Sequence, residues 1–147
     1  MNSYRVLGYL GITPMLFILA AIIWQRLWPA DTQLADQAVT DWLLHAFLMY
    51  SGLILAFMGG TLWAPNAQPK PAKWEPWLAV LPTFMALIAV LLDSLLSLAI
   101  LTTGYTAILA IEMGRPRWGE YASWYQNLRF TLSLWVVMAH LAMGFIV

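Results

Sequence analysis

Five long apolar stretches account for most of this 147-residue chain, and short polar segments join them. Each stretch is close to the length that a helix needs to cross the hydrocarbon layer of a bilayer, roughly 17 to 25 residues. The stretches comprise residues 6–23, 42–64, 77–92, 94–113 and 130–147. Because no water pairs backbone groups inside a bilayer, apolar segments of this length are typical of helices. The sequence predicts an all-α polytopic membrane protein, a single domain built as a bundle of five transmembrane helices.

Composition supports a membrane protein and excludes several kinds of site. Apolar residues make up 62% of the chain and charged residues 10%, with nine tryptophans. There is no cysteine, which excludes disulfides, thiol nucleophiles and thiolate-bound metal centres. The formal net charge is zero, so no overall field attracts nucleic acid. Sequence motifs of hydrolases and phosphate-binding loops are absent as well, and we expect neither a catalytic activity nor a metal site.

The cations are distributed unevenly between the two sets of loops. Arg26 alone falls in one set, and the six others fall in the other set: Arg5, Lys70, Lys73, Arg115, Arg117 and Arg129. Loops rich in lysine and arginine generally stay in the cytoplasm. The pattern predicts a cytoplasmic N-terminus, and an odd number of spans then leaves Val147 outside.

Small residues recur along the second span. Gly52, Ala56 and Gly60 follow one another at four-residue spacing, with Gly59 beside them. Helices in lipid associate closely where small residues let their backbones approach. We therefore interpret these four residues as a helix-packing face. Packing within the bundle is the favoured interpretation, and docking onto another membrane subunit is the alternative.

Ionisable groups near the ends of the fourth and fifth spans suggest an ion pair. A charge at bilayer depth is costly unless it is paired or functional. Glu112 lies near the end of the fourth span and Arg129 near the start of the fifth. An antiparallel arrangement would bring them to the same depth, so we expect an interfacial ion pair of Glu112 with Arg129, or with Arg115.

The segment between the fourth and fifth spans interleaves cationic and aromatic residues. It contains Arg115, Arg117, Trp118, Trp124 and Tyr125. Aromatic rings favour the acyl boundary, and guanidinium groups favour the phosphates of lipid head groups. We predict that this segment lies on the membrane surface.

Two histidines, His45 and His140, are the only imidazoles of the chain. They occupy different spans at similar predicted depths, and a pair of this kind can supply the two axial ligands of a haem. Ordinary contacts are the favoured explanation: His45 follows Asp41 by one helical turn, and a lone histidine in a membrane helix commonly bonds a neighbouring helix. We expect the protein to hold no cofactor, with bound phospholipid or quinone as the ligands to consider.

Three motifs give the chain a family resemblance. The segment 50–63 reads YSGLILAFMGGTLW, the segment 124–132 reads WYQNLRFTL, and Gly8, Gly11 and Pro14 form a Gly-x-x-Gly-x-x-Pro pattern. Together they resemble the signatures of the DUF3429 family, to which transmembrane protein sixty-nine of animals belongs. The resemblance covers nearly the whole chain. It implies a small polytopic protein of bacterial inner membranes or mitochondria with no established activity.

These observations lead to two hypotheses of function. The first is a non-catalytic accessory or assembly subunit of a larger membrane complex in the bacterial inner membrane, with a respiratory complex suggested by the distribution that the resemblance implies. Its partners would be membrane lipids and other integral membrane subunits. The second is a lipid- or quinone-binding membrane module that uses the aromatic and basic segment.

Overall fold

The fold is helical throughout the part of the chain that the structure describes. This structure is a computed structural model, and it describes residues 3–28, 33–63, 73 and 75–147. The helices are α1 (Ser3–Leu27), α2 (Gln33–Gly60), α3 (Glu75–Val90), α4 (Ser94–Met113), the 3-10 helix η1 (Pro116–Glu120) and α5 (Ser123–Ile146). No strand occurs among these described residues. The predicted all-α class is confirmed.

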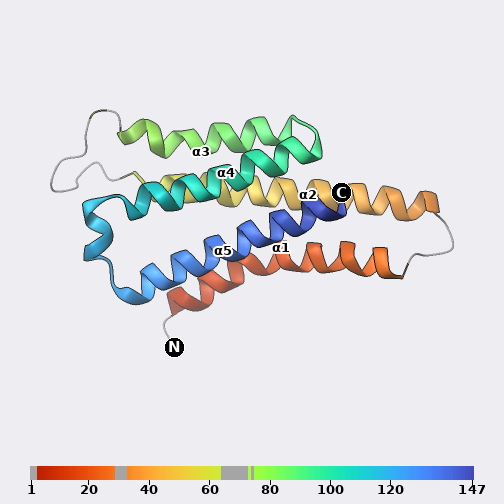
Figure 1. Cartoon of the computed structure of the whole chain (residues 1–147), viewed down its shortest axis with the longest axis horizontal. Helices are drawn as coiled ribbons and strands as arrows, with labels where there is room; N and C mark the ends of the chain where they lie inside the picture. Colours follow the sequence, from red (N-terminus) through yellow and green to blue (C-terminus); the bar gives the residue numbers. More distant parts are fainter. Residues whose placement is uncertain (1–2, 29–32, 64–72, 74) are drawn as a thin grey trace.

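The five α-helices run along one long axis and alternate in direction (Figure 1). The start of α1, the end of α2, the start of α3 and η1 therefore lie together at one end of the bundle. The described cations of this end are Arg5, Lys73, Arg115, Arg117 and Arg129, and we call it the basic end. At the opposite end, α1 and α2 extend beyond the connection between α3 and α4 (Figure 1).

Four of the helices are long and apolar enough to cross a membrane, namely α1, α2, α4 and α5. The third, α3, has 16 residues and a rise of about 24 Å, less than the roughly 30 Å of a typical hydrocarbon core. It is nonetheless apolar and lies parallel to the others. The protein is thus an all-helical membrane protein with five α-helices in its described part, of which four have full spanning length.

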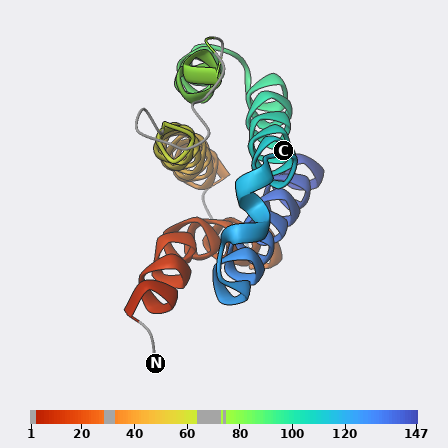
Figure 2. The ribbon, with the colours of Figure 1, turned by 90° about the vertical axis from the view of Figure 1, so that its left-hand side faces the viewer.

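The cross-section of the bundle is elongated, with α1 and α3 at its two edges (Figure 2). The central helix α2 contacts α1, α3 and α4, while α5 contacts α1 and α4. Side chains from all five helices form one apolar core, which includes Met15, Phe47, Ala89, Leu101 and Met143. Helix α1 therefore packs mainly against α2 and α5, and the site described below lies against it.

The observed helices differ from the predicted stretches mainly at their polar ends. Helix α2 begins at Gln33 rather than near residue 42, and α5 begins at Ser123 rather than near residue 130. Polar residues at the depth of the lipid head groups end the apolar stretch of the sequence, but the helix itself continues through them. The α3–α4 connection is short, and the Asp93 carboxylate caps α4 by accepting a hydrogen bond from the backbone N–H of Leu96 at 3.1 Å.

Candidate functional site

A buried ion pair joins α4 to α5 near the basic end. The guanidinium group of Arg129 contacts the carboxylate of Glu112, and only 4% and 5% of these residues are exposed. The Thr61 hydroxyl donates to Glu112 Oε1 at 3.0 Å, and Arg129 Nη1 also contacts the sulfur of Met58. Because Met58 and Thr61 belong to the end of α2 and the turn after it, the pair ties three segments together. Met58 and Thr61 lie within the motif of residues 50–63, but the sequence analysis did not connect them with the ion pair, since neither carries a charge.

Arg115 takes a different position from the one that an ion pair with Glu112 would require. It donates from Nη1 to the backbone oxygen of Leu62 at 3.2 Å. This contact attaches the segment after α4 to the turn after α2. Of the two alternatives for Glu112, the structure forms the pair with Arg129.

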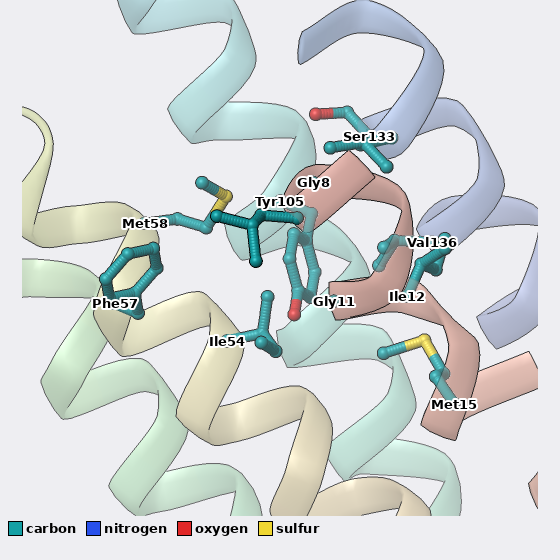
Figure 3. A pocket seen from close by; sticks show the side chains of 12 residues that line it. Gly8, Gly11, Ile12, Met15, Ile54, Phe57, Met58, Tyr105, Ser133 and Val136 are labelled. Carbon is teal, nitrogen blue, oxygen red and sulfur yellow. The ribbon is translucent and has the colours of Figure 1, made fainter. Parts of the chain in front are cut away.

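An apolar pocket of about 150 Å³ lies between α1, α2, α4 and α5 (Figure 3). Its α5 residues follow Arg129 along the helix, so the pocket lies farther from the basic end than the ion pair does. It is lined by Leu7, Gly8, Gly11, Ile12, Met15, Ile54, Phe57, Met58, Tyr105, Leu132, Ser133 and Val136. None of these side chains is charged, and only Ser133 and Tyr105 carry hydroxyl groups. Met58 connects the two features, since it lines the pocket and its sulfur contacts Arg129.

Part of the pocket is open because α1 has a glycine at position 11. A Cβ added at Gly11 would meet no atom within 4 Å, so the missing side chain leaves open space. The helix is held in place there by Tyr50, whose hydroxyl donates to the backbone oxygen of Gly11 at 2.7 Å. Leu7 on α1 and Phe57 on α2 line the pocket while being 64% and 71% exposed. The mouth of the pocket therefore lies between α1 and α2 and faces the lipid.

A buried hydrogen-bond network lies deeper in the bundle and forms one wall of this region. Ser51 Oγ and His140 Nε2 are 2.8 Å apart, and His140 Nδ1 lies 2.8 Å from the backbone oxygen of Val136. Because a carbonyl oxygen only accepts, Nδ1 carries a hydrogen, and the neutral ring accepts the Ser51 hydroxyl hydrogen at Nε2. The hydroxyl of Tyr105 donates to the backbone oxygen of Ser51 at 2.8 Å. Three helices are thus joined, while the Tyr105 ring lines the pocket.

The two histidines do not face each other. His45 is exposed on α2 and lines a groove together with Asp41 and Asp93, whereas His140 is buried and both its ring nitrogens have hydrogen-bond partners. Ligation of a haem iron by His140 would require the loss of its bond to Ser51. The arrangement fits the interhelical hydrogen bond that was favoured over the haem pair. In the part of the chain that the structure describes, no group of His, Asp and Glu residues has the geometry of a metal site.

The small residues of α2 divide into a packed pair and an open position. Gly52 approaches the Cβ of Ala86 in α3, and a Cβ at Gly59 would lie 2.7 Å from the backbone oxygen of Ala79. Gly60 is exposed, with nothing within 4 Å, so it does not take part in the packing of α2 within the bundle. Seven residues make nearly two turns of a helix, so Gly59 lies on the same face as Gly52. Gly60, eight residues after Gly52, is rotated about 80° away from that face. Ala56, between them, is half-buried.

The basic and aromatic segment forms η1 and the first turns of α5. Its rings make a continuous series of edge contacts, with centroid distances of 6.2 Å for Trp118 and Tyr121, 5.0 Å for Tyr121 and Tyr125, and 6.1 Å for Trp124 and Tyr125. The guanidinium carbon of Arg5 lies 5.7 Å from the Trp124 ring centroid, which connects α1 to this series. Arg117 is half-buried in η1. Cationic and aromatic groups thus surround the basic end, close to the start of the pocket-lining part of α1.

Comparison with known proteins identifies the family and no activity. No curated protein and no solved structure gives a significant match to the chain. The model of the DUF3429 family, which is described as a protein of unknown function, matches residues 2–145. That match covers nearly the whole chain, as the three motifs suggested, and this protein belongs to the DUF3429 family.

Proposed function

We propose that the protein binds an apolar membrane molecule. One ring of this molecule, or one segment of its hydrocarbon chain, enters the pocket between α1 and α2. The observation that carries this proposal is a glycine-lined apolar pocket with its mouth on the lipid face. A volume of about 150 Å³ is enough for a group the size of benzene or a short length of chain. A ligand already dissolved in the bilayer would reach this mouth without crossing water.

The surroundings of the pocket favour an amphiphile over a purely apolar molecule. Arg5 and Trp124 lie at the basic end beside the first turn of α1, and Gly8 follows on the same helix one turn later. Aromatic and guanidinium groups of this kind hold polar head groups at the membrane surface. The tail would lie in the pocket and along the α1–α2 surface.

Filling the pocket tests this proposal. Gly11→Leu places a side chain into open space, whereas Gly60→Leu adds the same side chain on an exposed position that does not line the pocket. The purified full chain, reconstituted in nanodiscs with a lipid extract, is released into native mass spectrometry, and retained ligands are counted. We expect one retained molecule with wild type and Gly60→Leu and none with Gly11→Leu. Equal retention by all three proteins would disprove the proposal.

A second candidate function is the accessory subunit of a membrane complex. It is supported by a strip of small residues on α4 that stays exposed in the bundle: Ala99, Thr103, Thr106 and Ala110. The spacing of four, three and four residues places them on one helix face, and Ala99 and Thr103 line a groove with Gly144 of α5. Such a face suits a transmembrane helix of a partner subunit.

The subunit proposal is tested by overpacking that face. A partner present in stoichiometric amount after purification in mild detergent should be lost from Ala99→Leu and Thr103→Leu. It should be retained by Leu96→Ala, a change at an exposed position on the same helix that adds no bulk and does not line this groove. If the partner is retained by all variants, or absent from wild type, α4 faces lipid alone.

We further propose that the basic end faces the cytoplasm and that the protein resides in a bacterial inner membrane. The excess of cations at this end over Arg26 at the other supports the orientation. The location follows from the distribution that the family resemblance implies. The orientation is tested by the labelling experiment described at the end of the Discussion.

A further inference from the structure

Ser133 is a largely buried residue whose hydroxyl has no hydrogen-bond partner among the described residues. Ser133 lines the pocket, and only 8% of the residue is exposed. The structure describes two other buried serines, and both are bonded: Ser51 to His140 and Ser97 to the backbone oxygen of Ala89. A hydroxyl that faces apolar surroundings without a hydrogen bond costs free energy. Ser133 is therefore placed where a ligand would repay that cost.

Ser133 also does not use the bond that helical hydroxyls usually form with their own helix. The hydroxyls of Thr102 and Thr103 donate to carbonyl oxygens one turn earlier, at 2.7 and 2.8 Å. The equivalent acceptor for Ser133 is the backbone oxygen of Arg129, and no such bond is formed. The hydroxyl remains available to donate to a molecule in the pocket, at whose edge Figure 3 shows it.

The chemistry of the lining excludes a charged head group from this position. The pocket has no charged side chain, and the nearest cation on α5, Arg129, is already paired with Glu112. Ser133 lies one turn beyond Arg129, roughly 6 Å deeper along α5. Ester groups of phospholipids stay at the interfacial layer, outside the hydrocarbon core. A neutral hydrogen-bond acceptor that can enter the core is the group that fits.

The shape and lining favour a ring as the carrier of that acceptor. The volume of about 150 Å³ is close to that of an apolar cavity known to hold benzene. The aromatic rings of Tyr105 and Phe57 line the pocket (Figure 3) and can pack against a flat ligand. A flexible acyl chain would fill the volume but would leave the Ser133 hydroxyl unpaired.

We propose that the ligand is a prenylated quinone, whose ring enters the pocket and whose carbonyl oxygen accepts a hydrogen bond from Ser133. This inference rests on the proposed function and assigns its ligand class. The isoprenoid tail leaves through the mouth between Leu7 and Phe57 into the lipid. Ser133 acts as a specificity residue, because it distinguishes a ring that carries a carbonyl from a plain hydrocarbon of similar shape.

Binding of two matched probes tests the inference. A benzoquinone with a decyl tail and decylbenzene have similar shapes and differ in the carbonyl groups. Each is titrated by calorimetry into the full chain in nanodiscs of phosphatidylethanolamine and phosphatidylglycerol. We expect the quinone to bind with one-to-one stoichiometry and more tightly than decylbenzene. Ser133→Ala should weaken quinone binding about threefold to fifteenfold, the range that one hydrogen bond within a membrane provides, and leave decylbenzene unchanged.

Two controls separate the possible failures. Thr103→Ala removes a lipid-facing hydroxyl outside the pocket and should leave the affinities for both probes unchanged, while Gly11→Leu should abolish both. Circular dichroism verifies that each variant keeps its helices. If the two probes bind wild type equally, or if Ser133→Ala leaves quinone affinity unchanged, the quinone inference is wrong, although the pocket still binds apolar molecules. If neither probe binds, or if Gly11→Leu binds both like wild type, the proposed function fails as well.

Discussion

The hydroxyl of Tyr50 in α2 donates a hydrogen bond of 2.7 Å to the backbone oxygen of Gly11 in α1. Gly11 also lines the pocket, so α1 is anchored at the residue whose missing side chain leaves the space. A glycine that borders a cavity would otherwise weaken the attachment of an edge helix. The hydrogen bond offsets that weakness without filling the pocket.

Tyr50→Phe should loosen this attachment. It removes one interhelical hydrogen bond and keeps the ring, so we expect a loss of about 0.6 to 1.7 kcal/mol in the free energy of unfolding. Reversible unfolding in mixed detergent micelles measures it. The control is Tyr9→Phe, because Tyr9 is exposed on α1. A variant as stable as the control would mean that the bond contributes nothing.

The contact between α2 and α3 predicts opposite effects for two neighbouring glycines. Gly59→Ala places a Cβ 2.7 Å from the rigid backbone oxygen of Ala79, and the helices must separate at a cost of about 1 to 3 kcal/mol. Gly60→Ala meets no atom within 4 Å and should be neutral or stabilise by up to about 1 kcal/mol through helix propensity. Unfolding free energies of the two variants, compared with wild type, decide this. Equal effects would argue against close packing of α3 at Gly59.

Because Glu112 and Arg129 form a buried ion pair, replacing one of them should destabilise the protein much more than replacing both. Glu112→Gln leaves the Arg129 charge buried without its counterion, which should cost about 3 to 5 kcal/mol. The double variant with Glu112→Leu and Arg129→Met removes both charges and should recover most of this loss. Glu120→Gln, an exposed carboxylate in η1, is the control and should have little effect. A double variant no better than the single one would mean that the pair itself is required.

The sequence allowed more of the fold to be predicted than of the site. Helix α4 was predicted with the bounds that the structure has, because its apolar stretch carries no charge before Glu112, near its end. The beginning of α5 was placed too late because Arg129 looked like a boundary, whereas its pairing with Glu112 lets the charge lie inside the helix. The length and hydropathy of a segment indicate where a helix can lie in a bilayer. Where the helix ends also depends on which side chains of neighbouring helices pair with its polar residues.

The pocket could not be predicted because it depends on which helices are neighbours. Gly8 and Gly11 were visible as a family motif, but the spacing alone does not show whether a glycine packs or leaves space. In the structure, a Cβ at Gly8 would lie 3.1 Å from Leu128, whereas Gly11 is open. Ser133 likewise carries no signal in the sequence. Its importance comes from its burial and from the bond that it does not make.

The Ser51–His140 contact predicts a colourless protein with a structural histidine. Both ring nitrogens of His140 have partners, so purified protein should show no Soret band in either redox state. Ser51→Ala should cost about 1 kcal/mol in unfolding free energy, since it removes one buried hydrogen bond. His45→Ala, at an exposed position, should have little effect. A Soret band in wild type that either histidine substitution abolishes would make haem binding the leading function.

The orientation is tested by thiol labelling, for which the chain is suited because it contains no cysteine. Single cysteines are introduced as Gln37→Cys, Leu92→Cys and Gly119→Cys, all at exposed positions, the first two toward one end of the bundle and the third in η1 at the other. A membrane-impermeant maleimide added to intact spheroplasts should label residues 37 and 92, and residue 119 only after lysis. Labelling of residue 119 alone would reverse the orientation. If residue 37 were labelled in intact spheroplasts, residue 119 only after lysis and residue 92 in neither case, the α3–α4 connection would lie within the membrane. Helix α3 would then enter the membrane without crossing it, as its 16-residue length allows.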